Sequence, residues 1–197
     1  SNEVMLQILQ AFGGPGRTAL SFAPTYSMYP EYARDTHTRW VTGRRDEDFT
    51  IDVERALALI AAEQPDVILL TSPNNPTGTA LPLETVRAVV EAAPGVVVVD
   101  EAYAEFRREG TPTALEVLGE FPRLLVTRTM SKAFALAGGR LVYVAADAAI
   151  IDALRIVMYV FPKDGGKPEK KAIPESEVGR AQAMHQVLVE AAAENDE

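Results

Sequence analysis

Polar side chains follow two predicted strands at the points where those strands end. An apolar run at 67–71 predicts a strand, and the turn-forming segment after it contains the amide Asn75. A second run at 95–100 lacks polar alternation, which is typical of a strand buried on both faces. It ends in the carboxylate Asp100, and the phenol Tyr103 follows. Carboxyl ends of parallel strands share one sheet edge, so we expect these groups to lie close together.

A third polar segment brings an amine to the same edge. It follows a strand predicted at 123–127 and contains the hydroxyl Ser131, the amine Lys132 and the guanidinium Arg140. Together, the three segments provide the groups that an anionic, aromatic aldehyde cofactor needs.

Each segment also has a simpler interpretation when it is taken alone. Residues 72–78 could form an ordinary Pro/Asn/Gly turn, and Asp100 could cap a helix or be a solvated carboxylate. Lys132 could be a solvated surface charge and Arg140 an ordinary ion-pair partner. The hypothesis of a cofactor site therefore depends on the three segments occurring together.

The elements between these segments alternate between helix and strand. Apolar spacing and turn signals predict helices at 1–12, 26–33, 53–63, 83–93 and 148–157, and strands at 18–22, 39–42, 67–71, 95–100, 123–127 and 140–144. This order predicts an α/β fold of three layers, with a mostly parallel sheet flanked by helices.

The character of the sequence changes near residue 162. Residues 162–171 are rich in Pro, Gly and charge, which is typical of a linker, and 178–193 could form one further amphipathic helix. We therefore expect one domain over 1–161 and a separate polar tail over 162–197.

Composition excludes several classes of protein. The formal net charge is −9 and the pI is about 4.8, so neither nucleic acid nor an anionic membrane is an expected partner. The chain has no Cys and only two His, which argues against thiol catalysis, a disulfide scaffold and an iron–sulfur or cysteine-zinc site. No secretion signal or membrane span is visible, and we expect a soluble cytoplasmic protein.

The three motifs, in this order, carry a resemblance to a known family. Ser-Pro-Asn-Asn-Pro-Thr-Gly at 72–78, Asp-Glu-Ala-Tyr at 100–103 and Ser-Lys-Ala-Phe-Ala-Leu-Ala-Gly-Gly-Arg at 131–140 resemble those of the class I/II pyridoxal-phosphate aminotransferases of fold type I. Within that family, residues 1–4, 24–28 and 127–134 are most similar to the histidinol-phosphate aminotransferases.

The resemblance implies a role for each residue around the cofactor ring. Lys132 would condense with the cofactor aldehyde, since only an amine can do so reversibly. Asp100 would pair with the protonated ring nitrogen. Asn75 and Tyr103 would donate hydrogen bonds to the ring oxygen, and Tyr26 would stack on the ring face, although Tyr26 could instead be a core aromatic residue.

The resemblance also implies a phosphate site. Backbone amides at Asn2 and Glu3, where the first helix begins, would bind the phosphate, assisted by the Ser131 hydroxyl and the Arg140 guanidinium. No metal would be required.

The implied reaction exchanges an amino group between a small-molecule amino donor and a 2-oxo acid, here histidinol phosphate and 2-oxoglutarate. Members of the family are roughly twice as long as this chain, near the upper range for two domains. We therefore expect an incomplete large domain, with the substrate-carboxylate arginine outside it and a homodimer in the full-length form.

Two alternative functions remain: another class I/II aminotransferase, and a cofactor-binding fragment or paralogue without turnover. A dinucleotide-binding domain is disfavoured because no Gly-x-Gly-x-x-Gly follows a strand.

Overall fold

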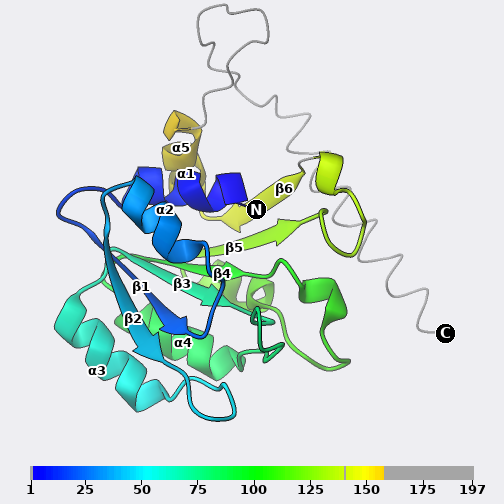
Figure 1. Ribbon diagram of the computed structural model, residues 1–197, viewed down its shortest axis with the longest axis horizontal. Helices are drawn as coiled ribbons and strands as arrows, with labels where there is room; N and C mark the ends of the chain where they lie inside the picture. Colours follow the sequence, from blue (N-terminus) through cyan, green and yellow to red (C-terminus); the bar gives the residue numbers. More distant parts are fainter. Residues whose placement is uncertain (1, 140, 158–197) are drawn as a thin grey trace, which may run out of the picture. The chain divides into compact units, whose positions relative to one another are not determined.

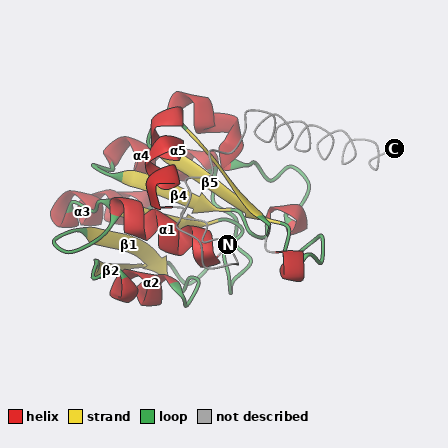
Figure 2. Ribbon diagram, turned by 90° about the horizontal axis from the view of Figure 1, so that it is seen from above, coloured by secondary structure: helices red, strands yellow, loops and turns green. Residues whose placement is uncertain are grey.

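A six-stranded sheet forms the centre of the computed structural model, which describes residues 2–139 and 141–157. The strands are β1 (Thr18–Ala23), β2 (Arg39–Arg44), β3 (Val67–Thr71), β4 (Val96–Asp100), β5 (Leu124–Thr129) and β6 (Val142–Ala146), in the spatial order β2-β1-β3-β4-β5-β6. All neighbours pair in parallel except β5 and β6, which are antiparallel. In Figure 2, strands β2, β1, β4 and β5 follow one another across the sheet in this order.

Helices cover both faces of this sheet. They are α1 (Asn2–Phe12), α2 (Tyr29–Asp35), α3 (Val53–Glu63), α4 (Leu83–Ala92) and α5 (Ala148–Val157). In Figure 1, α1, α2 and α5 lie on one side of the strands, and α3 and α4 lie on the other. This arrangement confirms the predicted three-layer α/β fold with a mostly parallel sheet.

Two apolar cores follow from this layering. Under α3 and α4, Ile60 and Val89 pack with Ile68 and Val97 of the sheet. On the opposite face, α1, α2 and α5 pack against alternate residues of the same strands, such as Val98. Strands β3 and β4 are consequently buried along their whole length, which explains their continuous apolar sequence.

Local sequence explains where the helices begin. The Asp52 side chain accepts a hydrogen bond from the Arg55 amide at 2.8 Å and caps α3, which begins at Val53 as predicted. Helix α2 begins later than predicted, at Tyr29 rather than Tyr26, because Pro30 occupies its first turn, where proline is best tolerated. Tyr26 therefore lies in the connection between β1 and α2.

The last two strands also differ from the prediction. Strand β5 continues to Thr129 instead of ending at 127, and β6 spans 142–146 instead of 140–144. The cause is their antiparallel pairing, in which Thr129 faces Val142 and the preceding Gly138 belongs to a short 3₁₀ turn. The domain boundary predicted at 161, and the tail at 162–197, lie outside the described residues.

Candidate functional site

A cavity of about 190 Å³ opens at the carboxyl ends of β3 and β4, beside the loop that follows β5. Ten residues line it: Asn2, Tyr26, Thr71, Asn75, Asp100, Ala102, Tyr103, Ser131, Lys132 and Ala137. The structure therefore brings seven of the nine predicted site residues to one place, from segments that span most of the domain.

Asp100 is the most deeply buried charged group of this cavity, with 4% of its surface exposed. Its Oδ2 accepts a hydrogen bond from the Tyr29 hydroxyl at 2.9 Å. Its Oδ1 accepts from the Ala102 amide at 3.1 Å and from the Thr127 hydroxyl at 3.2 Å. Burial raises the pKa of the Asp100 carboxyl, and these three hydrogen bonds oppose that shift.

The three groups that donate hydrogen bonds to Asp100 are neutral. In residues 2–139 and 141–157, no Lys, Arg or His side chain forms an ion pair with this carboxylate. A buried charge without a counter-ion is costly, and proteins ordinarily pair such a group. Asp100 is thus suited to receive a cation from a molecule bound in the cavity.

Sheet register explains why three side chains converge here. Thr71, Asp100 and Thr127 are direct partners across β3, β4 and β5, so they form one row at the carboxyl edge. Thr71 and Thr127 were not expected in the site, although their positions at the ends of neighbouring strands are a signal that could have indicated them. Tyr29 has no comparable signal, since it reaches Asp100 only because α2 packs over the sheet.

The Tyr26 ring lines the cavity next to Asn2, the first residue of α1. The Tyr26 hydroxyl donates to Asn2 Oδ1 at 3.1 Å, and its ring meets the Tyr29 ring edge to face, with centroids 5.5 Å apart. These two contacts hold the Tyr26 ring at the cavity and connect it to the beginning of the first helix.

Lys132 and Tyr103 lie near each other on the side of the cavity formed by two loops. Lys132 Nζ is 5.4 Å from the centroid of the Tyr103 ring. The Thr129 hydroxyl donates a hydrogen bond to the Ser131 hydroxyl at 2.9 Å and accepts one from the Ser131 amide at 3.2 Å. These two bonds fix the residue before Lys132. Residues 1–162 contain no lysine other than Lys132, so a primary side-chain amine can reach this cavity from one position in that range.

The loop that carries Asn75 is held by its neighbour. Asn74 is buried, and its Nδ2 donates to the Pro24 carbonyl at 3.1 Å and to the Thr77 hydroxyl at 2.7 Å. The Gly78 amide closes the turn on the Asn74 carbonyl at 2.7 Å, with Gly78 at a φ of 73° that favours glycine. The Asn75 side chain is therefore presented to the cavity by a loop with its own hydrogen bonds.

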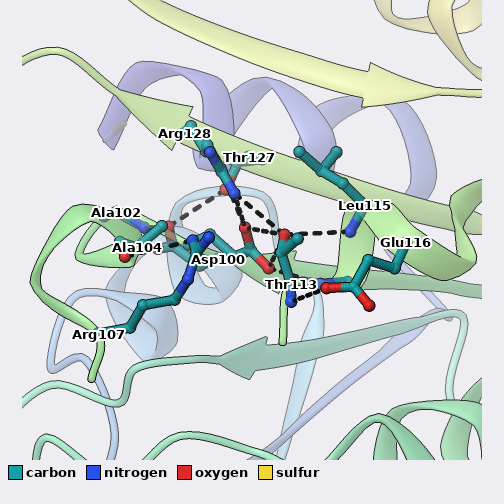
Figure 3. Close-up of polar contacts among 11 residues, drawn as sticks. Asp100, Ala102, Ala104, Arg107, Thr113, Leu115, Glu116, Thr127 and Arg128 are labelled. Atoms are coloured by element: carbon teal, nitrogen blue, oxygen red, sulfur yellow. Dashed lines mark hydrogen bonds and ion pairs between the residues drawn. The ribbon is translucent and has the colours of Figure 1, made fainter. Parts of the chain in front are cut away.

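The second carboxylate of the Asp-Glu-Ala-Tyr motif is not among the residues that line the cavity. Glu101 is 3% exposed, and its Oε2 accepts hydrogen bonds from Arg128 Nε at 3.0 Å and Nη2 at 2.8 Å. Its Oε1 accepts from the Ala114 amide at 2.7 Å, and the Thr113 hydroxyl also bonds to it. Figure 3 shows two side chains that bond to this carboxylate, Arg128 and Thr113, pointing toward each other near Asp100.

This buried cluster, which we call the Glu101 clamp (Glu101, Thr113, Ala114 and Arg128), links three parts of the chain. It ties the end of β4 to the start of the 3₁₀ helix Ala114–Glu120 and to β5. Burial lowers the pKa of the Arg128 guanidinium, but the Glu101 and Tyr143 charges and the hydrogen bonds to Glu101 together raise it by more, so the net shift is upward. Arg128 is therefore charged in the folded protein at neutral pH.

Two predicted residues are not placed at the cavity. Glu3 lies in the first turn of α1 and is not among the lining residues. Arg140 lies outside the described residues. The described part of the chain contains no group of three or more His, Asp or Glu side chains that could hold a metal ion, and none of its helices is long and apolar enough to cross a membrane.

Comparisons with known proteins agree with this geometry. A family model described as aminotransferase class I and II matches residues 1–162. A histidinol-phosphate aminotransferase 3 of Burkholderia lata is 64% identical over 157 residues, which cover 80% of this chain and 42% of that protein. A histidinol-phosphate aminotransferase of Thermobifida fusca is 62% identical over 157 residues, covering 80% of this chain and 43% of that protein.

A solved structure has a similar fold. The histidinol-phosphate aminotransferase of Sinorhizobium meliloti, in complex with pyridoxal-5'-phosphate, superposes with a TM-score of 0.70 at 29% identity. The match covers 76% of this chain and 41% of that one. The chain spans between 40% and 44% of the length of the curated relatives it matches.

Proposed function

The chain belongs to the class I and II aminotransferases, and from that premise we propose that it is the cofactor-binding part of a pyridoxal-phosphate-dependent aminotransferase. The observation that carries the proposal is the buried Asp100 carboxylate, which has no cationic partner in the described residues and faces a cavity that also holds Lys132. The donor set fits the cofactor. A carboxylate suits a cationic ring nitrogen, an aromatic ring suits a planar heterocycle, and an amine suits an aldehyde.

When bound, pyridoxal phosphate supplies an aldehyde that condenses with amines and a cationic ring that takes up the electrons released at the substrate Cα. Asp100 would hold the proton on the ring nitrogen, since its three neutral donors leave it able to accept one more hydrogen bond. Tyr26 would cover one face of the ring. Asn75 and Tyr103 would donate hydrogen bonds to the ring oxygen.

Lys132 would have two successive roles. Its amine would hold the cofactor through the aldehyde until the amine of a substrate takes its place. The freed Lys132 Nζ would then hold the proton removed from the substrate Cα and deliver it to the former aldehyde carbon of the cofactor. Lys132 is exposed at the cavity, so its side chain can move between these positions without disrupting a packed core.

The phosphate would be held at the other end of the cavity. Asn2, at the first residue of α1, and Glu3 would offer backbone amides at a helix N-terminus, where the helix dipole favours an anion. Ser131 would add its hydroxyl and Arg140 its guanidinium.

We propose histidinol phosphate as the amino donor and 2-oxoglutarate as the acceptor. The support is the high identity to proteins named histidinol-phosphate aminotransferases over the domain that holds the cavity. We also propose that the full-length protein is a cytoplasmic homodimer, as the family resemblance implies, and that neither nucleic acid nor a membrane is its partner.

Borohydride reduction tests the proposal directly. The protein is mixed with pyridoxal phosphate, reduced and digested, and the modified peptide is identified by mass spectrometry. The modification should lie on Lys132, while the lysines at 163, 167, 170 and 171 serve as internal controls because they lie outside the family match. Lys132→Ala should lose the adduct and keep the circular dichroism spectrum. Modification only of the control lysines would refute the proposed cofactor site.

A second experiment tests the substrate. The full-length protein should convert histidinol phosphate when 2-oxoglutarate is present, measured by glutamate release. Formation of the Lys132 adduct without glutamate release from histidinol phosphate would keep the cofactor assignment and refute the proposed substrate pair.

A further inference from the structure

A row of three hydroxyl groups, buried at Tyr29 and Thr71 and half-buried at Thr25, leads to Asp100. Tyr29 is fully buried, and its hydroxyl lies 2.9 Å from Asp100 Oδ2 and 2.9 Å from the Thr71 hydroxyl. The Thr71 hydroxyl lies 3.2 Å from the Thr25 hydroxyl. These four side chains come from the β1–α2 connection, α2, β3 and β4, and we call them the hydroxyl chain (Thr25, Thr71, Tyr29 and Asp100).

The donor and acceptor of each hydrogen bond in the hydroxyl chain follow from counting protons. A phenol has one proton, and an ionised carboxylate can only accept, so Tyr29 donates its proton to Asp100. Thr71 must then donate to the Tyr29 oxygen, and Thr25 must donate to Thr71. Every hydroxyl in the chain therefore points its proton toward Asp100 while that carboxylate is charged.

We propose that Tyr29 is a positioning residue for the aminotransferase, which acts through Asp100 by fixing Oδ2 and stabilising its negative charge, so that the carboxylate keeps the cofactor ring nitrogen protonated. This inference rests on the proposed function. It adds a residue that no motif at the strand ends contains and that does not line the cavity itself.

The environment of Tyr29 suits this role. Burial is the main cause that raises the pKa of the Tyr29 hydroxyl well above its usual value, and the Asp100 charge raises it further. The Tyr29 hydroxyl therefore keeps its proton at neutral pH and can donate it in a hydrogen bond. The other ionisable side chains that act on this region are Tyr26, whose ring contacts Tyr29, with Tyr32 and Arg45.

The geometry also explains why a phenol is needed at position 29. Asp100 Oδ1 already has two donors, the Ala102 amide and the Thr127 hydroxyl, whereas Tyr29 is the donor to Oδ2 among the described side chains. Removing the phenol hydroxyl would leave Oδ2 without that bond in a buried site. The carboxylate would then be held at Oδ1 alone, and its negative charge would be less well stabilised.

The test compares two phenol deletions on the same helix. Tyr29→Phe removes the hydroxyl next to Asp100 and keeps the ring, while Tyr32→Phe removes another buried phenol hydroxyl of α2 that forms no hydrogen bond with Asp100. Both variants and the wild type are loaded with pyridoxal phosphate labelled with ¹⁵N in the ring. The nitrogen chemical shift then reports whether the ring nitrogen is protonated.

For Tyr29→Phe we expect a shift toward the neutral ring nitrogen and cofactor binding weaker by roughly tenfold or more, the size expected for loss of one hydrogen bond to a charged group. Tyr32→Phe should match the wild type in both measurements. Thr71→Val should shift the nitrogen signal in the same direction as Tyr29→Phe but less, and Thr71→Ser should restore it, because serine keeps the hydroxyl.

The outcomes separate this inference from the proposed function. A wild-type protein that binds no cofactor would refute the proposed function and this inference with it. A wild-type signal from a protonated ring nitrogen that stays unchanged in Tyr29→Phe would refute only the role of Tyr29. Equal changes in Tyr29→Phe and Tyr32→Phe would also refute it, because they would show a general effect of losing a phenol from α2.

Discussion

Replacement of Arg128 by methionine would remove the cation from the Glu101 clamp and keep a side chain of similar length. Arg128 and Glu101 side chains are 12% and 3% exposed, so the carboxylate that remains could not be solvated. The substitution deletes two hydrogen bonds to Glu101 Oε2 and one to the Thr113 hydroxyl. Breaking a buried pair from one side costs about 3–5 kcal/mol.

That loss is large compared with the free energy of unfolding of a typical domain, which is about 5–15 kcal/mol. For a domain of this size it corresponds to a fall in melting temperature of roughly 6–20 °C. Urea denaturation of the cofactor-free protein, followed by circular dichroism, measures it. Arg87→Met is the matched control, because Arg87 pairs with Glu120 on the surface and its loss should leave the unfolding midpoint nearly unchanged.

A double-mutant cycle tests the physical reason. Glu101→Gln should destabilise the wild type, because Arg128 loses its counter-ion. In the Arg128→Met background the same change should stabilise, because glutamine removes the stranded charge and keeps an acceptor for the Ala114 amide. The reasoning would be wrong if Arg128→Met cost no more than Arg87→Met, or if Glu101→Gln destabilised both backgrounds equally.

Three further outcomes are expected. Gly95→Ala should destabilise the domain by about 1–3 kcal/mol, because a Cβ would overlap the Asp66 backbone carbonyl, whereas Gly119→Ala has open space and should be nearly neutral in the same urea assay. Asp52→Ala should cost about 1 kcal/mol by removing the cap of α3, and Asp52→Asn should retain most of that stability. Burial raises the folded-state pKa of Asp100 above 3.8, so its contribution to folding without cofactor is greatest at low pH and is lost as the pH rises through the folded pKa. Asp100→Asn should therefore become progressively more stable than the wild type over that rise; a stability difference independent of pH would contradict the raised pKa.

The sequence predicts elements best where local signals and tertiary packing agree. The bounds of α3, β3 and α5 match the prediction, since a capping aspartate, a buried apolar run and helical apolar spacing each specify one structure. The segment between Glu101 and Phe121 has no such periodicity. Its two 3₁₀ helices depend on contacts such as the bonds from Thr113 and Ala114 to Glu101, which local patterns do not encode.

The same contrast holds for the site. Residues at strand ends, such as Asn75 and Asp100, were predictable because the parallel fold brings strand ends to one edge. Asp100 and Glu101 are adjacent acids, and successive side chains at the end of a strand point to opposite sides. Asp100 therefore lines the cavity, whereas Glu101 forms the Glu101 clamp. Tyr29 could not be predicted, because its contact with Asp100 spans two layers of the fold.

The antiparallel pairing of β5 with β6 determines where this domain can accept insertions. The parallel strands are joined through helices that also pack in the apolar cores, so insertions in those connections would disturb the packing of a helical layer. Lys132 instead lies in a loop whose two ends are fixed to each other by the pairing of Thr129 with Val142. Doubling the length of a flexible loop costs only about 0.6 kcal/mol in closure entropy. Insertions around the lysine could therefore reshape the entrance to the cavity while the row of Thr71, Asp100 and Thr127 stays in register.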